Sequence, residues 1–253
     1  MPAKYFFRGL SMIYFAAILV FTIGALIQRV TGFGLGIFAM IFLPYIAGSY
    51  GEANVLSGMV SIVFCLIVGY SYLKYINWRN ILIPAAASTV VSYFAVEFMK
   101  TQDDGTMRLI LGVFLICLSV YFMFFSCKIK IRATWYTGLI AGALSGVMGG
   151  LFAMGGPPMV IYFMQSEKDI NCYMGTIQGY FLLSGVFTVL IKAAAGFVTP
   201  NVMLLWLVGL IGLPAGILIG RLIHRKIDAC LIRRLVYAVM ALSGAVNIVS
   251  YLV

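Results

Sequence analysis

Runs of about twenty apolar residues recur along the whole of this 253-residue sequence. Each run is long enough to cross the roughly 30 Å hydrocarbon core of a bilayer as an α-helix. Hydrophobic residues make up 63% of the chain and charged residues only 9%, whereas ordinary soluble domains have about a quarter charged residues. No hydrophilic stretch is long enough to form an extramembrane domain. The pattern predicts an all-α polytopic membrane protein, with one transmembrane domain over residues 1–253.

The formal net charge of +10 could point to nucleic acid, but the placement of the basic residues favours another explanation. These residues fall in short connections between apolar runs, as the positive-inside rule expects. They form no basic face interleaved with aromatic residues, so we expect no nucleic-acid partner. The partner that the sequence predicts is the lipid bilayer.

Ten apolar segments can be delimited, five on each side of a basic connection at 128–132. Their approximate bounds are 10–30, 33–48, 54–74, 80–99, 107–126, 134–150, 156–166, 172–194, 201–220 and 230–252. The two sets of five agree in order and length, and short matches occur between them, such as Gly24-Ala25-Leu26 with Gly142-Ala143-Leu144. The sequence therefore predicts an internal duplication, with one repeat over about 10–126 and a second over about 134–253.

Basic residues gather at three connections, 74–79, 128–132 and 221–234. If all ten segments cross or re-enter the membrane, these connections lie on one side, the cytoplasm, and the two repeats have opposite orientations. We therefore expect two inverted repeats with 8–10 spans in all. Lys4 and Arg8 conflict with this orientation, because it places them outside.

Two short segments, 33–48 and 156–166, occupy matching places in the two repeats, and each follows a glycine-rich break. Segment 156–166 would be only about 16 Å long at 1.5 Å per residue, which is too short to span a bilayer. Short segments interrupted by Gly or Pro at matching places of two repeats are typical of transport sites. Unpaired N–H groups and the dipole at a helix N-terminus attract anions. We expect the two helix starts to face one anion site.

The candidate substrate-binding residues come from the two breaks and from polar side chains in later segments. They are Gln28, Arg29, Thr31, Gly32, Phe33, Gly34, Gly36, Asn54, Gly155, Gly156, Pro157, Thr176 and Gln178. Arg29 is suited to pair with an anion through its planar guanidinium, although an interfacial arginine could equally reach lipid headgroups. Asn54, Thr176 and Gln178 could instead form hydrogen bonds between helices.

Other polar and small residues have simpler interpretations. Glu97 and Lys192 lie near the ends of apolar segments, where we expect them to face the membrane interface. Glycines recur four apart over 138–150 and 212–220, a spacing that lets helices pack closely in lipid and needs no ligand. We interpret these two stripes as packing faces, within one chain or between two copies, so a homo-oligomer is an open alternative.

Sequence signatures of catalysis and of metal binding are missing. With one histidine, the chain has no His-Glu-x-x-His zinc motif, and we find no Walker loop. We expect no enzyme activity, no bound metal and no cofactor. Coupling of transport to H+ or Na+ is left open.

The two breaks carry recognisable motifs. The first is Thr31-Gly32-Phe33-Gly34-Leu35-Gly36 with Pro44, and the second is Gly150-Leu151-Phe152-Ala153-Met154-Gly155-Gly156-Pro157-Pro158, followed by Tyr162 and Gly175-Thr176. In these motifs and in its duplicated layout, the chain resembles the sulfite exporter TauE/SafE family, also called the 4-toluene sulfonate uptake permease family. The resemblance implies a multi-pass permease of the bacterial cytoplasmic membrane for sulfite, sulfonates or related anions. It also adds Tyr162 to the candidate substrate-binding residues.

Together these observations predict a secondary transporter of small anions that works by alternating access around a site between the two breaks. Two alternatives stay open at this point. One is a passive channel for small anions, and the other is a membrane scaffold subunit that transports nothing.

Overall fold

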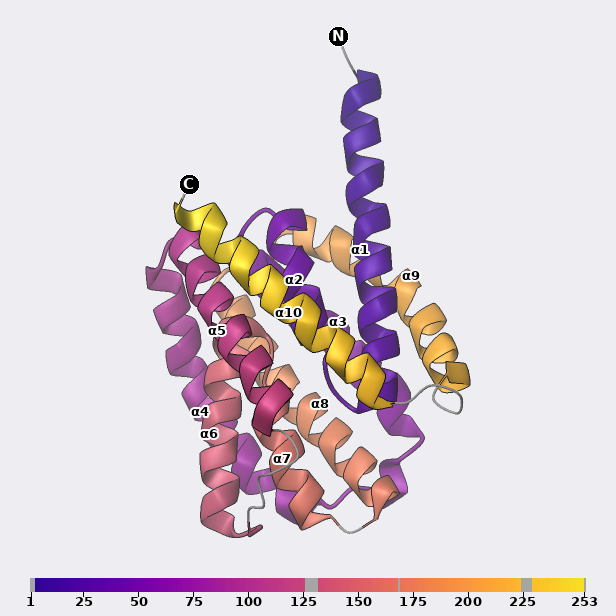
Figure 1. The fold of residues 1–253 in the computed structure, drawn as a ribbon, viewed down its shortest axis with the longest axis vertical. Helices are drawn as coiled ribbons and strands as arrows, with labels where there is room; N and C mark the ends of the chain where they lie inside the picture. The colour runs from indigo at the N-terminus through magenta and orange to yellow at the C-terminus, as the bar shows by residue number, and fades with distance from the viewer. Residues whose placement is uncertain (1–2, 126–131, 168, 224–228, 253) are drawn as a thin grey trace.

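The computed structural model describes residues 3–125, 132–167, 169–223 and 229–252, and these residues form α-helices and one short 3-10 helix, with no β-strand. The helices are α1 (Ala3–Thr31), α2 (Leu35–Ile46), α3 (Tyr50–Tyr70), η1 (Leu73–Tyr75), α4 (Trp78–Thr101), α5 (Asp104–Phe125), α6 (Trp135–Phe152), α7 (Gly156–Ser166), α8 (Ile170–Ala194), α9 (Pro200–Ile223) and α10 (Ala229–Leu252) (Figure 1). Each of the ten predicted segments corresponds to one α-helix. The basic connections predicted at 128–132 and 221–234 lie partly outside the described residues.

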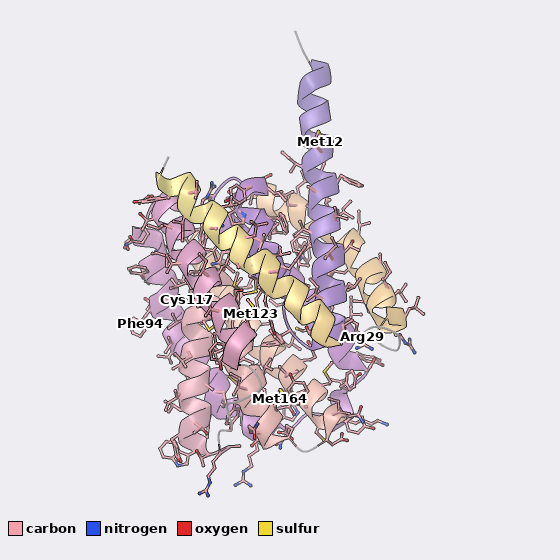
Figure 2. The ribbon with its side chains drawn as sticks, in the orientation of Figure 1. Met12, Arg29, Phe94, Cys117, Met123 and Met164 are labelled. Atoms are coloured by element: carbon pink, nitrogen blue, oxygen red, sulfur yellow. The ribbon has the colours of Figure 1, made fainter. Side chains whose placement is uncertain are left out.

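Seven of the described helices are long and apolar enough to cross a membrane: α1, α3, α4, α5, α6, α8 and α9. Large apolar side chains cover the outside of the bundle, as Figure 2 shows for Met12, Phe94, Met123 and Met164, which are 58–69% exposed. Such a surface suits lipid rather than water. The protein is therefore an all-α polytopic membrane protein, as the sequence predicted. The count of 8–10 spans stays a prediction.

The two glycine stripes pack helices against each other within the chain. A side chain at Gly142 of α6 would collide with the carbonyl of Pro84 in α4, and one at Gly216 of α9 would collide with the carbonyl of Thr22 in α1. This close backbone approach is what small residues allow in a membrane. The interpretation of the stripes as packing faces is confirmed, and a homo-oligomer, which stays a prediction, would use another surface.

Helices of the two predicted repeats pair with each other in a symmetric way. The α1–α9 pair lies on one side of the bundle and the α4–α6 pair on the other (Figure 1), and these pairs correspond when the repeats are exchanged. The corresponding helices α5 and α10 run antiparallel, because Gly105 lies beside Tyr251 while Ser119 donates a hydrogen bond to the carbonyl of Tyr237. Opposite directions of this kind are what an inverted repeat requires. They support that prediction without testing the orientation in a membrane.

Polar side chains are buried along α3 and α8, which pack against each other at the centre of the bundle. They are Asn54, Ser57, Thr176, Gln178, Ser184, Thr188 and Lys192. Polar residues are expensive at membrane depth and mark substrate or ion pathways. The centre of the bundle is therefore the place to look for a functional site.

Candidate substrate-binding site

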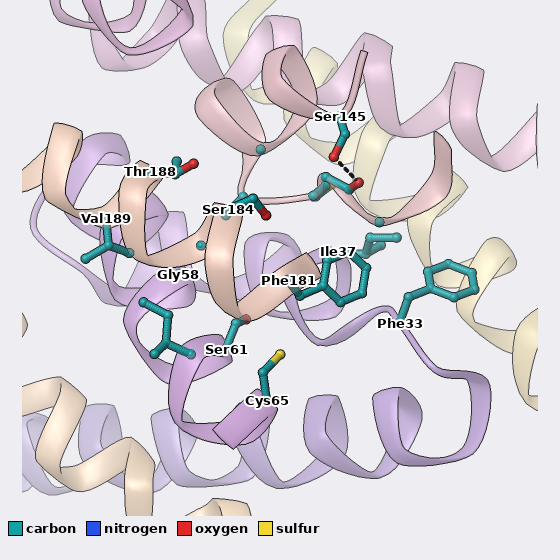
Figure 3. A pocket seen from close by; sticks show the side chains of 18 of the residues that line it. Phe33, Ile37, Gly58, Ser61, Cys65, Ser145, Phe181, Ser184, Thr188 and Val189 are labelled. Atoms are coloured by element: carbon teal, nitrogen blue, oxygen red, sulfur yellow. Dashed lines mark hydrogen bonds between the residues drawn. The ribbon is translucent and has the colours of Figure 1, made fainter. Parts of the chain in front are cut away.

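A cavity of about 100 Å³ lies at this centre, between both breaks, α3 and α8 (Figure 3). A space of this size suits a few water-sized groups. Its polar lining residues are Gln28, Ser61, Cys65, Ser88, Ser145, Ser184, Thr188 and Lys192. This cavity is called the central pocket below.

The first break turns the chain from α1 into α2 through glycines with a left-handed backbone. Gly32 has φ 85° and Gly34 has φ 114°, values that other residues rarely adopt. The side chain of Gln28 reaches forward, and its Oε1 accepts a hydrogen bond from the Leu35 backbone N–H at 3.1 Å. The N–H groups of Gly36 and Ile37 belong to the same first turn of α2 and have no partner within the helix. Both residues line the central pocket.

The second break leads from α6 into α7 with different chemistry. Ala153 ends α6 with φ 54°, and Pro157 and Pro158 lie in the first turn of α7, where they bring no backbone N–H. The Ser145 hydroxyl donates a hydrogen bond to the carbonyl of Gly155 at 2.5 Å (dashed in Figure 3). Tyr180 of α8 donates in turn to the Ser145 Oγ at 2.8 Å. The break is therefore fixed to both α6 and α8.

The two breaks touch each other at the central pocket. A side chain at Gly36 would collide with the carbonyl oxygen of Ala153, and a Cβ at Gly156 would lie 3.3 Å from the Cβ of Phe33. Glycine is required at position 36, where a side chain would meet backbone, whereas at position 156 a small shift of Phe33 would make room for a methyl group. The starts of α2 and α7 are thus brought to one pocket, as the sequence analysis expected. Anion binding there stays a prediction.

Lys192 of α8 supplies the charge in the central pocket. Among the described residues that line it, only this one has a charged side chain, and it is 1% exposed. Its Nζ donates to Oδ1 of Asn54 at 2.5 Å and to the carbonyl of Gly149 at 3.0 Å. Among the described residues, the one ion pair is Lys100 with Glu97, on the surface. Lys192 therefore has no carboxylate partner in the described part of the chain.

The expectation that Lys192 faces the membrane interface was wrong. Although the residue lies near the end of α8, α3 and the end of α6 surround it there. A signal was present in the sequence, because Ser184, Thr188 and Lys192 are spaced four apart and so share one helix face. This polar stripe was not among the predicted site residues. Glu97 does lie near the surface, as expected.

Six of the fourteen candidate residues line the central pocket: Gln28, Phe33, Gly34, Gly36, Gly155 and Gly156. Arg29 does not, since it packs against Gly220 of α9 near the end of α1 (Figure 2). Thr31 bonds within the first break through the carbonyls of Ile27 and Phe33. Pro157 is buried in the first turn of α7 without lining the pocket.

The remaining candidates form hydrogen bonds between elements. Thr176 accepts from the backbone N–H of Asn77 at 3.1 Å, and Gln178 donates to the carbonyl of Gly32 at 3.4 Å. Asn54 is occupied by Lys192 and by carbonyls of α6. Tyr162 lines a different cavity, between α4, α6 and α7. The contacts of Asn54 match the alternative of helix-to-helix bonds that the sequence left open for Asn54, Thr176 and Gln178. Thr176 and Gln178 bond instead to backbone groups just before α4 and just after α1.

A membrane bundle with a buried polar pocket between two broken helices has an architecture found in membrane transporters. The chain belongs to the sulfite exporter TauE/SafE family, whose family model matches residues 16–246. It is a member of a family of membrane transporters, and not of a family of enzymes.

The chain is also similar to a curated relative whose name states a function. Over 162 residues the chain is 26% identical to a Cupriavidus necator protein named "Probable sulfite/organosulfonate exporter TauE". The match covers 59% of this chain, and the chain spans 61% of the length of that relative. No solved structure matches the chain.

Proposed function

We propose that this protein is a secondary transporter of small sulfur-containing anions, with sulfite and sulfonates as the expected substrates, and that the anion binds in the central pocket. The observation that carries the proposal is Lys192, a buried cation without a carboxylate partner among the described residues. A charge at membrane depth is costly unless it is paired. An anion in the pocket would supply the missing partner. The name of the curated relative supports the choice of substrate class.

The groups around Lys192 suit an oxyanion. The ammonium has three N–H donors, and Asn54 and Gly149 accept two of them. The third can point to a ligand in the pocket. The hydroxyls of Thr188 and Ser184 lie one and two turns away on the same face of α8, and both line the pocket. In this structure the Thr188 hydroxyl donates to the Ser92 Oγ at 3.4 Å and the Ser184 hydroxyl donates to the carbonyl of Tyr180 at 2.8 Å. The third N–H of the ammonium is therefore the first donor for a sulfite or sulfonate oxygen, and the two hydroxyls would turn from their present acceptors to bind further oxygens.

The position of the pocket supports alternating access as the mechanism. Both breaks line it, so a rocking motion of one repeat against the other would open it to each side of the membrane in turn. We place the protein in the bacterial cytoplasmic membrane as a multi-pass permease. The inverted relation of the two repeats belongs to this proposal.

The experiment is a flux measurement on purified protein in proteoliposomes. Labelled sulfite, sulfoacetate, sulfate and acetate are offered with no gradient, with a proton gradient and with a sodium gradient. Accumulation of a sulfur anion above its external concentration under a gradient supports a secondary transporter. Equilibration without accumulation under any gradient would show a passive channel instead. Absence of flux for every anion, with protein that still unfolds cooperatively on heating, would favour a scaffold role.

A further inference from the structure

Helix α6 ends inside the bundle, and its last carbonyl groups face α3 and α8. A helix C-terminus carries a partial negative charge and attracts cations. In transporters with broken helices, carbonyls at such ends bind the coupling Na+ or H+. The end of α6, at Gly149, Gly150 and Leu151, is therefore a position where a small monovalent cation is expected.

In this chain each of these carbonyls already has a donor from a side chain. Lys192 donates to Gly149 at 3.0 Å. The Asn54 Nδ2 donates to Gly150 at 3.2 Å and to Leu151 at 2.6 Å, and the Asn54 Oδ1 accepts from Lys192. The Tyr50 hydroxyl also donates to Leu151, at 2.8 Å. The one charged donor in this arrangement is the ammonium of Lys192, which contacts the Gly149 carbonyl directly and the Gly150 and Leu151 carbonyls through Asn54. It has the charge of a sodium ion.

We propose that the Lys192 ammonium occupies the cation position at the end of α6, so that the protein provides its own cation and transports anions without sodium. The proposal rests on the proposed function for its second part, transport, but not for its first part, the cation position. Asn54 is then a positioning residue. Its neutral amide accepts from the ammonium without cancelling the charge, which a carboxylate there would do.

This arrangement also links the anion to the α6 end. Two N–H groups of the ammonium bond to Asn54 and Gly149, which leaves the third for a ligand in the central pocket that Lys192 lines. An anion bound there would be connected through one side chain to the second break. A separate sodium ion would be redundant, because it would compete with the ammonium for the Gly149 carbonyl oxygen and the Asn54 Oδ1.

The cation position is tested by thermal unfolding of purified Lys192→Ala, which removes the ammonium and leaves the carbonyls. Methylammonium should raise the unfolding temperature of this variant, increasingly with concentration, because it binds the folded state. Choline at the same ionic strength is too large and should have no such effect. Wild type and Lys100→Ala, which lacks only a surface ammonium, should respond equally to both salts. An equal response of Lys192→Ala to methylammonium and choline would overturn the proposal.

The sodium question is tested on wild type, so it does not depend on the folding of a variant. Flux of the transported anion is measured with all sodium replaced by N-methylglucamine on both sides. Flux within about twofold of that in sodium supports the proposal, and loss of flux without sodium refutes it while leaving the proposed function intact. If no anion is transported in any salt, the proposed function fails, and the unfolding experiment still decides whether the cation position exists.

Discussion

The two broken helices reach the same pocket with different chemistry. At the first break, the donors and acceptors are neutral: the Gln28 amide caps α2, and the Thr31 hydroxyl bonds to carbonyls of Ile27 and Phe33. At the second break, the ammonium of Lys192 and the amide of Asn54 hold the end of α6. The corresponding ends of two similar repeats therefore differ in charge.

This difference indicates a division of roles. The first break can offer the N–H groups of Gly36 and Ile37 at the start of α2, which have no partner within that helix. The second break has few such donors, because prolines occupy the first turn of α7. It lies instead beside the ammonium of Lys192. An anion between them would meet directed N–H groups on one side and an ammonium on the other. The predictions below test this division, beginning with the largest expected effect.

Removal of the charge at the second break should have the largest effect on anion binding. Lys192→Met keeps most of the length of the side chain and loses the ammonium. Because a hydrogen bond to a charged group contributes about 1.5–3 kcal/mol, anion affinity should fall by about 10- to 100-fold. The measurement is a titration with sulfite followed by the shift in unfolding temperature, with Lys100→Met as the control. Unchanged affinity would remove Lys192 from the site.

Substitutions at the contact between the two breaks should have the next largest effect, and this effect should be on the unfolding temperature. In Gly36→Ala the new methyl group collides with the backbone carbonyl of Ala153, whereas in Gly156→Ala it meets the Cβ of Phe33 at 3.3 Å, which can move slightly. Overpacking of a rigid site costs about 1–3 kcal/mol, so Gly36→Ala should unfold at a clearly lower temperature than Gly156→Ala. Thermal unfolding in detergent measures both. Equal effects would mean that the breaks are farther apart than the structure shows.

Substitutions of Gln28, the neutral cap at the first break, should have smaller effects. They should separate the stability of the protein from its anion affinity. Gln28→Leu removes the acceptor of the Leu35 N–H and should cost about 1 kcal/mol of stability, as the loss of a helix cap does. Gln28→Glu keeps an acceptor there but adds a negative charge to the pocket. It should therefore retain stability and weaken anion binding. If Gln28→Leu weakened anion binding more than Lys192→Met, the charge would belong to the first break and not to the second.

Much of the fold could be predicted from the sequence, because membrane helices can be recognised from the length and hydropathy of their apolar runs. The bounds of α7, 156–166, agree at both ends with the predicted segment. The breaks were also found, since Gly32 and Gly34 adopt positive φ as their residue type suggests. The site was predicted less well, because its members depend on which helices become neighbours. Lys192 lies near the end of α8, yet it is buried by α3 and by α6, which ends inside the bundle.

Arg29 is the opposite case to Lys192, because it was predicted to be in the site and lies outside it. Its substitution should therefore have the smallest effect on anion affinity. It was the charged candidate at the first break, but it lies on the face of α1 that packs against Gly220 of α9, while its neighbour Gln28 faces the pocket. Arg29→Ala should therefore change anion affinity by less than about 0.5 kcal/mol, or about twofold. The sulfite titration used for Lys192→Met measures this directly. A loss of tenfold or more would bring a second cation to the site, and the contrast between a neutral first break and a charged second break would then be wrong.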